Sequence, residues 1–205
     1  GATFADEKRS ILLDYGSKGL RALDGTAEIA EKLEVTLLKK EHGGAASARN
    51  AGLKIASGSL ILFLDADDVL CPDAFSELFR ILFQDEESDA AFAMAEDFIS
   101  PELTENQKSM LRPREGKYGG VLPGCSLIRR AVFDTVGYFD ETMKSGETIA
   151  WQMKLRESGL RIVSTDSVTL KRRLHLSNTG RLHQKREMSD YAALLRKKYE
   201  KAERK

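Results

Sequence analysis

Apolar runs and helical patterns alternate along the chain, and each kind of segment predicts a different element. Consecutive apolar residues predict strands at residues 10–13, 34–38, 60–64, 90–94, 126–128 and 162–170. Helix-forming or amphipathic segments predict helices at residues 26–33, 45–57, 72–83, 130–136, 148–157 and 187–205. The strand–helix alternation across residues 10–64 predicts a mainly parallel sheet with crossover helices, and therefore an α/β fold.

Two other segments have a distinct pattern. Residues 72–83 place Phe75, Leu78, Phe79 and Leu82 at helical spacing, which predicts that these four side chains share the buried face of the helix. Residues 100–120 are polar and carry Pro101, which is typical of a long loop. Loops of this kind often lie over a functional site.

Residues 60–68 are the most informative part of the chain. Five consecutive apolar residues predict a strand buried on both faces, and the strand ends in Asp65, Asp67 and Asp68. Crowded carboxylates repel one another unless a cation neutralises them, and Mg²⁺ and Mn²⁺ prefer oxygen ligands. Asp65 and Asp67 are two apart on an extended segment, so they point the same way and could share one metal. The alternative is a solvated turn in which Asp68 caps the next helix.

Two clusters nearer the N-terminus are candidates for ligand binding. Asp14 ends a predicted strand, where it is either a turn-forming residue or a hydrogen-bond acceptor for a nucleobase or ribose. Gly43 and Gly44 precede a helix that carries Arg49 and Asn50. Free N–H groups at a helix start favour an anion, and Arg49 adds a positive charge there. Taken alone, however, the two glycines are equally typical of a turn.

A C-terminal cluster combines an acid, two arginines and a histidine. Glu147 begins a predicted helix, where it either complements the helix dipole or acts as a general base. Arg172 and Arg173 suit a diphosphate, because guanidinium groups bind phosphate oxygens bidentately, although a solvated basic stretch has the same composition. His175 is a candidate metal ligand, and its alternative is a structural or exposed role.

Composition narrows the class of protein. The 205 residues suit one domain, predicted to span residues 1–185 with a charged helical tail at 186–205. Lys plus Arg and Asp plus Glu both total 32, so no net charge attracts nucleic acid. Cys71 and Cys125 lack the spacing of a metal finger or a disulfide framework. With no apolar stretch long enough to span a bilayer, a cytoplasmic protein is expected, and peripheral association with a membrane stays open.

Several of these segments together resemble the inverting family 2 glycosyltransferases of the GT-A fold, from Ile11 to about Gly180. Residues 47–53 (SARNAGL), 56–58 (ASG) and 63–68 (FLDADD) are similar to the family signature A-R-N-x-G, A-x-G and F-L-D-A-D-D. Residues 11–17 (ILLDYGS) are similar to the family's I-V-D-D-G-S, and residues 132–141 (VFDTVGYFDE) to F-x-x-V-G-x-F-D-E. Gly146 and Glu147 stand where the family usually has G-E-D.

The resemblance implies a Rossmann-like mixed sheet, mainly parallel, with flanking helices. It also implies a site that binds a nucleoside-diphosphate sugar, UDP-linked by preference, together with Mn²⁺ or Mg²⁺. Its implied nucleotide-sugar contacts are Asp14, Arg49, Asn50, Asp65, Ala66, Arg172 and Arg173. Its implied metal ligands are Asp67 and His175, and Glu147 would be the base that deprotonates the acceptor hydroxyl.

The chain departs from the family pattern at three places. Tyr15 replaces the second acid of the first motif, and Thr148 replaces the acid that usually follows Glu147. The family's opening strand, V-S-V-I-I-P-x-Y-N, has no counterpart in residues 1–9. We therefore expect residues preceding Gly1, a neighbouring chain or another segment to fill its place, because a gap in a sheet exposes apolar surface.

The function that these expectations favour is metal-dependent transfer of a sugar to an acceptor hydroxyl with inversion, in a bacterial polysaccharide or related pathway. A second interpretation, favoured by Tyr15 and Thr148, is a degenerate module that binds a nucleotide sugar or a partner without catalysis. A third is a nucleotidyltransferase, which usually opens with a Gly-rich phosphate loop that is not visible here. The donor sugar and the acceptor are not specified by the sequence, and a homodimer stays open.

Overall fold

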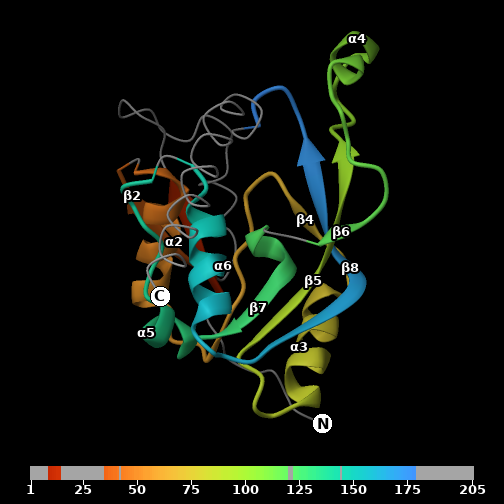
Figure 1. The fold of residues 1–205 in the computed structure, drawn as a ribbon. Coiled ribbons are helices and arrows are strands. Elements are labelled where there is room, and N and C mark those ends of the chain that lie inside the picture. The colour runs from red at the N-terminus through yellow and green to blue at the C-terminus, as the bar shows by residue number, and fades with distance from the viewer. Residues whose placement is uncertain (1–8, 15–34, 42, 120–121, 144, 179–205) are drawn as a thin grey trace, which may run out of the picture.

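The computed structural model describes residues 9–14, 35–41, 43–119, 122–143 and 145–178 (Figure 1). Its strands are β1 (Arg9–Asp14), β2 (Val35–Lys40), β3 (Leu60–Ile61), β4 (Val69–Leu70), β5 (Ala90–Ile99), β6 (Tyr118–Gly119), β7 (Ser126–Arg129) and β8 (Ile162–Leu174). Its helices are α2 (Gly44–Ile55), α3 (Ala74–Gln84), α4 (Glu105–Ser109), the 3₁₀ turn η1 (Pro123–Cys125), α5 (Val132–Val136) and α6 (Glu147–Glu157). The helices predicted at residues 26–33 and 187–205 lie outside the described residues, so the predicted division at residue 185 stays a prediction.

The described strands form two separate sheets. β1 and β2 pair in parallel, while the second sheet has the order β3-β7-β5-β8-β4, with β6 paired to β5. The long β5–β8 pairing is parallel and runs from Ala90↔Ile162 to Ile99↔Leu174. The pairings β3–β7, β4–β8, β5–β6 and β5–β7 are antiparallel. The mixed α/β sheet is thus confirmed. Among the described strands, the parallel pairings are β5–β8 in this mixed sheet and β1–β2 in the smaller sheet.

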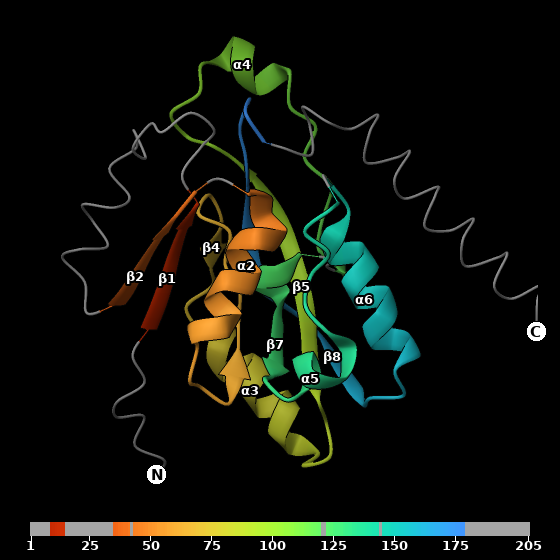
Figure 2. The ribbon, with the colours of Figure 1, turned by 90° about the vertical axis from the view of Figure 1, so that its left-hand side faces the viewer.

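Helices cover both faces of the larger sheet. Successive residues of a strand point to opposite faces, and β5 shows this directly. Ala90 and Phe92 pack in a cluster with residues of α2, α5 and α6, whereas Ala91 and Ala93 pack against α3. Figure 2 shows α2 and α6 standing side by side in front of the sheet, with α3 behind its lower end. The helices α2 and α6, which carry Arg49 and Glu147, therefore lie on the same face.

Strand β3 is shorter than predicted. It covers only Leu60–Ile61, and the side chain of Leu64 is exposed. β3 lies at the edge of its sheet, where its only described partner is β7, so residues 62–64 have no described strand with which to form a ladder. The prediction of a five-residue strand buried on both faces was therefore wrong, because a run of apolar residues does not show how many strands flank it.

The buried face of α3 also differs from the prediction. Its buried residues are Ala74, Leu78, Ile81 and Leu82, at the i, i+4, i+7, i+8 spacing of a helix face. Phe75 lies in a neighbouring row and is exposed, so its assignment to the buried face was wrong. The helix turns the smaller Ala74 toward the sheet, and this choice depends on the shape of the surface opposite it.

Residues 100–120 contain structure of their own. After β5, the chain forms the short helix α4, whose N-cap residue Thr104 makes a capping box with Gln107. The chain then returns to β5 through β6, so that Tyr118 pairs with Ala95. The predicted long loop thus contains a short helix and a strand, and it forms an arm that projects beyond the sheet, as both ribbon views show (Figures 1 and 2).

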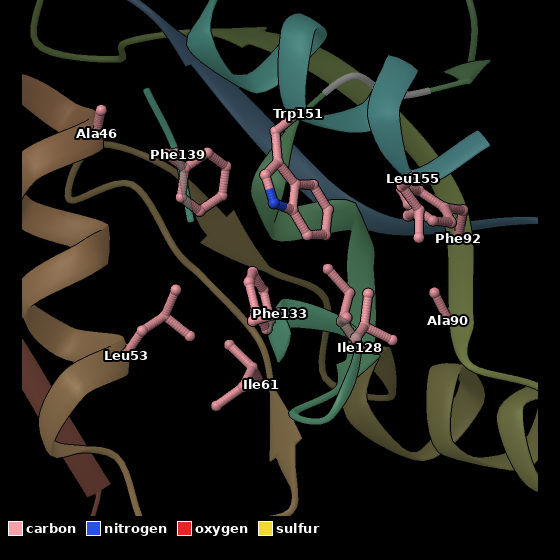
Figure 3. Close-up of a cluster of buried hydrophobic side chains, with 11 residues drawn as sticks. Ala46, Leu53, Ile61, Ala90, Phe92, Ile128, Phe133, Phe139, Trp151 and Leu155 are labelled. Atoms are coloured by element: carbon pink, nitrogen blue, oxygen red, sulfur yellow. The ribbon is translucent and has the colours of Figure 1, made fainter. Parts of the chain in front are cut away.

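The largest hydrophobic cluster joins α2, β3, β5, β7, α5 and α6 (Figure 3). Trp151 of α6 stacks on Phe133 with ring centroids 4.9 Å apart, and its Nε1 donates to the carbonyl of Gly137 at 2.7 Å. Phe139 lies 5.3 Å from the same indole ring. Because this cluster ties α6 to α2, it fixes the position of the residues at the start of α6.

We expect Trp151→Ala to lower the free energy of unfolding by about 3–5 kcal/mol, because it removes a large side chain from the centre of the core. Trp151→Phe retains most of the packing and loses mainly one hydrogen bond, so its expected cost is about 1 kcal/mol. The matched control is Tyr138→Ala, because Tyr138 is an exposed aromatic residue of the same region. Urea unfolding followed by circular dichroism measures all three, and equal losses for Trp151→Ala and Tyr138→Ala would contradict this account.

Candidate functional site

The three aspartates after β3 form a tight turn. The N–H of Asp68 donates to the carbonyl of Asp65 at 3.1 Å, and β4 follows directly. Asp65 and Asp67 have side chains that are 41% and 40% exposed, so both carboxylates can reach a ligand. Ala66 is exposed between them. The turn therefore presents two carboxylates to solvent within one short segment.

Asp67 lies next to His175, and the resemblance implies that these two residues are metal ligands. The Nε2 atom of His175 lies 2.9 Å from Oδ2 of Asp67, and its Nδ1 atom lies 2.8 Å from Oγ of Ser177. The amide of Asn178 donates to the same Oδ2 atom at 3.2 Å. Within the part of the chain that the structure describes, no group of three or more His, Cys, Asp or Glu residues could hold a metal ion. The carboxylate of Asp67 and the imidazole of His175 are thus in direct contact, with Asn178 and Ser177 as their hydrogen-bond partners.

Arg173 braces the turn from strand β8. Its backbone N–H donates to Oδ1 of Asp68 at 3.0 Å, and its Nε donates to the carbonyl of Asp67 at 2.9 Å. Its guanidinium also donates to Oγ of Ser100 and lies 4.8 Å from the ring of Phe98. The sequence placed both arginines after the last strand, whereas β8 continues through Leu174 and includes them. Strand pairing therefore fixes the backbone of Arg173 beside the aspartates.

Arg172 lies beside a buried carboxylate on β5. Its Nη1 atom is 3.9 Å from Oδ1 of Asp97, whose side chain is only 2% exposed. Asp97 also accepts a hydrogen bond from the hydroxyl of Tyr118 and one from the backbone N–H of Arg114. Burial, and then the Asp97 carboxylate, raise the pKa of Tyr118 to about 12, so this hydroxyl stays protonated as a donor. Asp97 thus links Arg172 to strand β6 through the hydroxyl of Tyr118.

Arg49 connects the acidic turn to the start of α6. Its Nη2 atom donates to Oδ1 of Asp65 at 2.9 Å, and its Nη1 atom donates to Oε1 of Glu147 at 2.8 Å. The Nη1 atom also donates to Oγ1 of Thr148 at 3.0 Å. Gly146 has a positive φ of 74°, a conformation that favours glycine and lets the chain turn into α6 with Glu147 as its first residue. Glu147 and Asp65 are therefore joined through one guanidinium group.

Asn50 holds the segment that leads to α6. Its Nδ2 atom donates to the carbonyl of Phe139 at 2.9 Å and to Oε1 of Glu141 at 2.8 Å, and its Oδ1 atom accepts from the N–H of Phe139 at 3.0 Å. Asn50 is only 3% exposed. Its amide is thus engaged by protein groups, and the expected contact with a nucleotide sugar stays a prediction.

The remaining candidates are Asp14 and the two glycines before α2. Asp14 is the last residue of β1 and pairs with Lys40, but its side chain lies outside what the structure describes. Gly43 precedes α2, and a Cβ atom there would lie 2.7 Å from Oγ of Ser47, so only glycine fits without displacing that side chain. Gly43 is therefore explained by its close approach to Ser47, and Gly44 by its positive φ of 81°. The predicted anion contact at this helix start stays a prediction.

The surroundings of Asp68 shift its pKa. Burial, opposed by the N–H of Arg173 and reinforced by the charges of Asp67 and Asp65, raises the pKa of Asp68 from 3.8 to about 6. The pKa of Asp68 is higher in the folded protein than in the unfolded chain. Its contribution to the free energy of unfolding is therefore fully present below pH 3.8 and is lost as the pH rises through about 6. Ionised Asp68 therefore costs stability at neutral pH in the absence of a cation.

We expect Asp68→Asn to raise the free energy of unfolding near neutral pH by about 1–2 kcal/mol in metal-free buffer, after allowance for partial solvent screening. Below about pH 4, where the wild-type carboxyl is itself protonated, the difference should vanish. Chemical denaturation at a series of pH values measures the effect, with the exposed Asp134→Asn as the control. A pH-independent difference between Asp68→Asn and the wild type would contradict the assignment.

The sequence missed several members of the site. Thr148 departs from the family motif, yet its hydroxyl accepts from Arg49 and donates to Oε1 of Glu147 at 3.1 Å. Asp97 and Tyr118 were not singled out, because their proximity to Arg172 depends on the pairing of β5 with β8 and β6. A signal for Asn178 was present in its position three residues after His175, typical of a polar turn, and its side chain accepts from the N–H of His175.

This arrangement defines a Rossmann-like α/β protein whose candidate site lies at the acidic turn after β3 and includes the start of α6. Residues 11–137, more than half of the chain, match the model of the family described as glycosyl transferase family 2, and the chain belongs to this family. The resemblance seen in the sequence is thereby confirmed. Among the described residues, no helix is both long and apolar enough to cross a membrane.

Relatives and solved structures agree with this family. The uncharacterized glycosyltransferase YibD of Escherichia coli (strain K12) is 28% identical over 196 residues, covering 84% of this chain and 55% of YibD. The structure of S. aureus TarS 1–349 in complex with UDP matches with a TM-score of 0.55 and 25% identity, over 74% of this chain and 48% of that chain. The TarS complex with UDP-GlcNAc matches at 0.57 with 23% identity, over 76% and 48%, which shows the fold alone. The chain spans about half the length of the curated relatives it matches.

Proposed function

We propose that this chain forms the donor site of a glycosyltransferase that moves a sugar from a nucleoside-diphosphate sugar to an acceptor hydroxyl with inversion. The observation that carries the proposal is the convergence of Asp65, Asp67, Glu147 and His175 around one exposed turn, on elements far apart in sequence. Membership of glycosyl transferase family 2 and the likeness to TarS, which was solved with UDP, support a uridine nucleotide as the donor's leaving group.

The donor would lie against the acidic turn. In this proposal Asp14 contacts the base, Asp65 and Ala66 contact the ribose, and Arg172 contacts the diphosphate. Asp67 and His175 would hold Mn²⁺ or Mg²⁺, because a carboxylate oxygen and an imidazole nitrogen 2.9 Å apart are a donor pair suited to such ions. When bound, the ion would neutralise the negative charge of the diphosphate.

Arg49, Arg173 and Asn50 have protein partners that suggest a second kind of role. Arg173 would brace the turn through the carbonyl of Asp67 and the carboxylate of Asp68, in addition to facing the diphosphate. Asn50 would keep the segment before α6 in place through its three hydrogen bonds. These contacts reduce the rearrangement that the site needs on binding the donor, which is an advantage of preorganised sites.

Glu147 would act as the base. The acceptor hydroxyl oxygen forms a bond to the anomeric carbon, and the bond from that carbon to the β-phosphate oxygen breaks with its electron pair leaving on the diphosphate. The hydroxyl proton passes to Glu147. In the described part of the chain both partners of the Glu147 side chain bond to Oε1, so Oε2 is available for this proton. The Glu147 side chain is only 15% exposed, so little water can compete with the acceptor hydroxyl for its carboxylate.

A second candidate function is nucleotide-sugar binding without transfer. The observation in its favour is that Thr148 stands where the family usually has a second acid, while Arg49 neutralises Glu147 at 2.8 Å. The two functions differ in turnover and agree in binding. Incubation with UDP-GlcNAc and other UDP-sugars, with detection of released UDP, tests them: UDP release that depends on Mn²⁺ supports transfer, and binding without release supports the silent module. Release of pyrophosphate would instead indicate a nucleotidyltransferase.

A further inference from the structure

Arg49 stands between two acids that act on opposite sides of the proposed reaction. Its side chain is only 10% exposed, and it contacts Asp65 at 2.9 Å and Glu147 at 2.8 Å. These residues come from three different parts of the chain, 16 and 98 residues away from Arg49. One guanidinium group therefore sets the separation between the donor-side carboxylate and the proposed base.

The hydrogen-bonding capacity of Arg49 is largely used by the protein. Both N–H groups of Nη1 have acceptors, Glu147 Oε1 and Thr148 Oγ1, and one N–H of Nη2 donates to Asp65. Two carboxylates also outnumber the single positive charge, so this cluster carries net negative charge. A diphosphate is attracted poorly to a cation that is already neutralised in this way. Arg49 is thus better placed to hold protein groups than to bind phosphate.

Packing against Phe139 restricts the position of the Arg49 side chain. Its guanidinium carbon lies 5.6 Å from the centre of the Phe139 ring, and Phe139 is buried in the main cluster. Asn50, the next residue of α2, forms hydrogen bonds with the backbone of Phe139 in both directions. The Phe139 ring and the Asn50 hydrogen bonds therefore restrict where the guanidinium group can lie.

Thr148 completes the contact. Its hydroxyl donates to Oε1 of Glu147 at 3.1 Å and accepts from Arg49. An acid at this position would place a third carboxylate around one guanidinium, with like charges repelling. The threonine instead adds a neutral hydrogen bond that fixes the orientation of the Glu147 carboxylate. This explains how a single acid can occupy the start of α6 without its usual neighbour.

We propose that Arg49 is a positioning residue, which together with Thr148 holds Glu147 and Asp65 in a fixed arrangement and does not bind the donor diphosphate. The inference rests on the proposed function, because it assigns Arg49 a role in the same site. It goes further by separating residues that contact the donor from one that acts through other residues.

The test compares Arg49→Met, Arg49→Lys and Thr148→Val with the matched control Arg80→Met, which removes a solvent-exposed arginine paired with Glu77. For Arg49→Met we expect UDP affinity in Mn²⁺ and the KM for UDP-GlcNAc to stay within about threefold of wild type, while kcat falls about 100-fold through misplacement of Glu147. Lysine keeps the charge but lacks the fork, so Arg49→Lys should recover only part of kcat. Thr148→Val should lower kcat by about tenfold, and Arg80→Met should change neither parameter.

A loss of UDP affinity in Arg49→Met with kcat preserved at saturating donor would overturn the proposal and identify Arg49 as a diphosphate ligand. Failure of the proposed function gives a different result, because the wild type itself would then release no UDP from UDP-GlcNAc. In that case a thermal double-mutant cycle of Arg49→Met and Glu147→Gln tests the contact without a ligand. Additive shifts of the melting temperature would overturn it, and a double variant that melts close to either single variant supports it.

Discussion

Replacing Glu147 with glutamine is expected to lower kcat by about 10²–10⁴, which is the usual contribution of a general base. The amide cannot accept the acceptor's proton, but it has nearly the same shape and can still accept a hydrogen bond from Arg49. The Kd for UDP in the presence of Mn²⁺ should therefore stay close to that of the wild type. Steady-state release of UDP gives kcat, and calorimetric titration gives the Kd.

The control for this variant is Glu86→Gln, the same chemical change at an exposed position after α3. It should leave kcat and Kd unchanged. Wild-type turnover in Glu147→Gln would rule out Glu147 as the base and move attention to another acid. Loss of UDP binding together with turnover would instead place Glu147 in the donor site, which disagrees with its hydrogen bonds to Arg49 and Thr148.

Replacing Asp67 with alanine is expected to weaken UDP binding in Mn²⁺ by more than about 100-fold, because removing a residue that binds the metal costs more than removing a residue that only hydrogen-bonds to such a ligand. Binding of UDP without Mn²⁺ should change much less. The fold should persist, since the lost contacts of Asp67 with His175 and Asn178 lie in a partly exposed turn and contribute about 1 kcal/mol each.

Asp73→Ala is the matched control for this second variant. Asp73 is an exposed acid six residues along the chain, and its side chain does not cap α3. Circular dichroism of both variants shows whether the fold persists. Unchanged affinity of Asp67→Ala for UDP plus Mn²⁺ would remove Asp67 from the metal site, and the pairing with His175 would then be a structural hydrogen bond.

The sequence predicted the parts of the site that depend on local order. The aspartates after an apolar run and the glutamate at a helix start are close in sequence to the elements that place them, so their positions followed from pattern. The convergence of Asp67 with His175 followed from the family resemblance rather than from the residues alone. The structure places the two side chains 2.9 Å apart, and their role as metal ligands stays a prediction.

The sequence could not predict contacts that depend on packing between distant elements. Arg49 carries a charge suited equally to phosphate and to carboxylate, and only the placement of α2 against α6 supplies Glu147 and Thr148 as its partners. The length of β3 and the buried face of α3 likewise depend on what lies opposite them. A run of apolar residues indicates burial, but it contains no information on which neighbour covers each side chain.

The measurement that tests the central claim most directly is calorimetric titration of UDP into the 205-residue chain with and without Mn²⁺. The account predicts binding that is much tighter in the presence of Mn²⁺, that is weakened by more than about 100-fold in Asp67→Ala and that is retained in Glu147→Gln. Binding of UDP with the same affinity in the presence of EDTA, or no binding under either condition, would contradict a metal–diphosphate site formed by Asp67 and His175 in this chain.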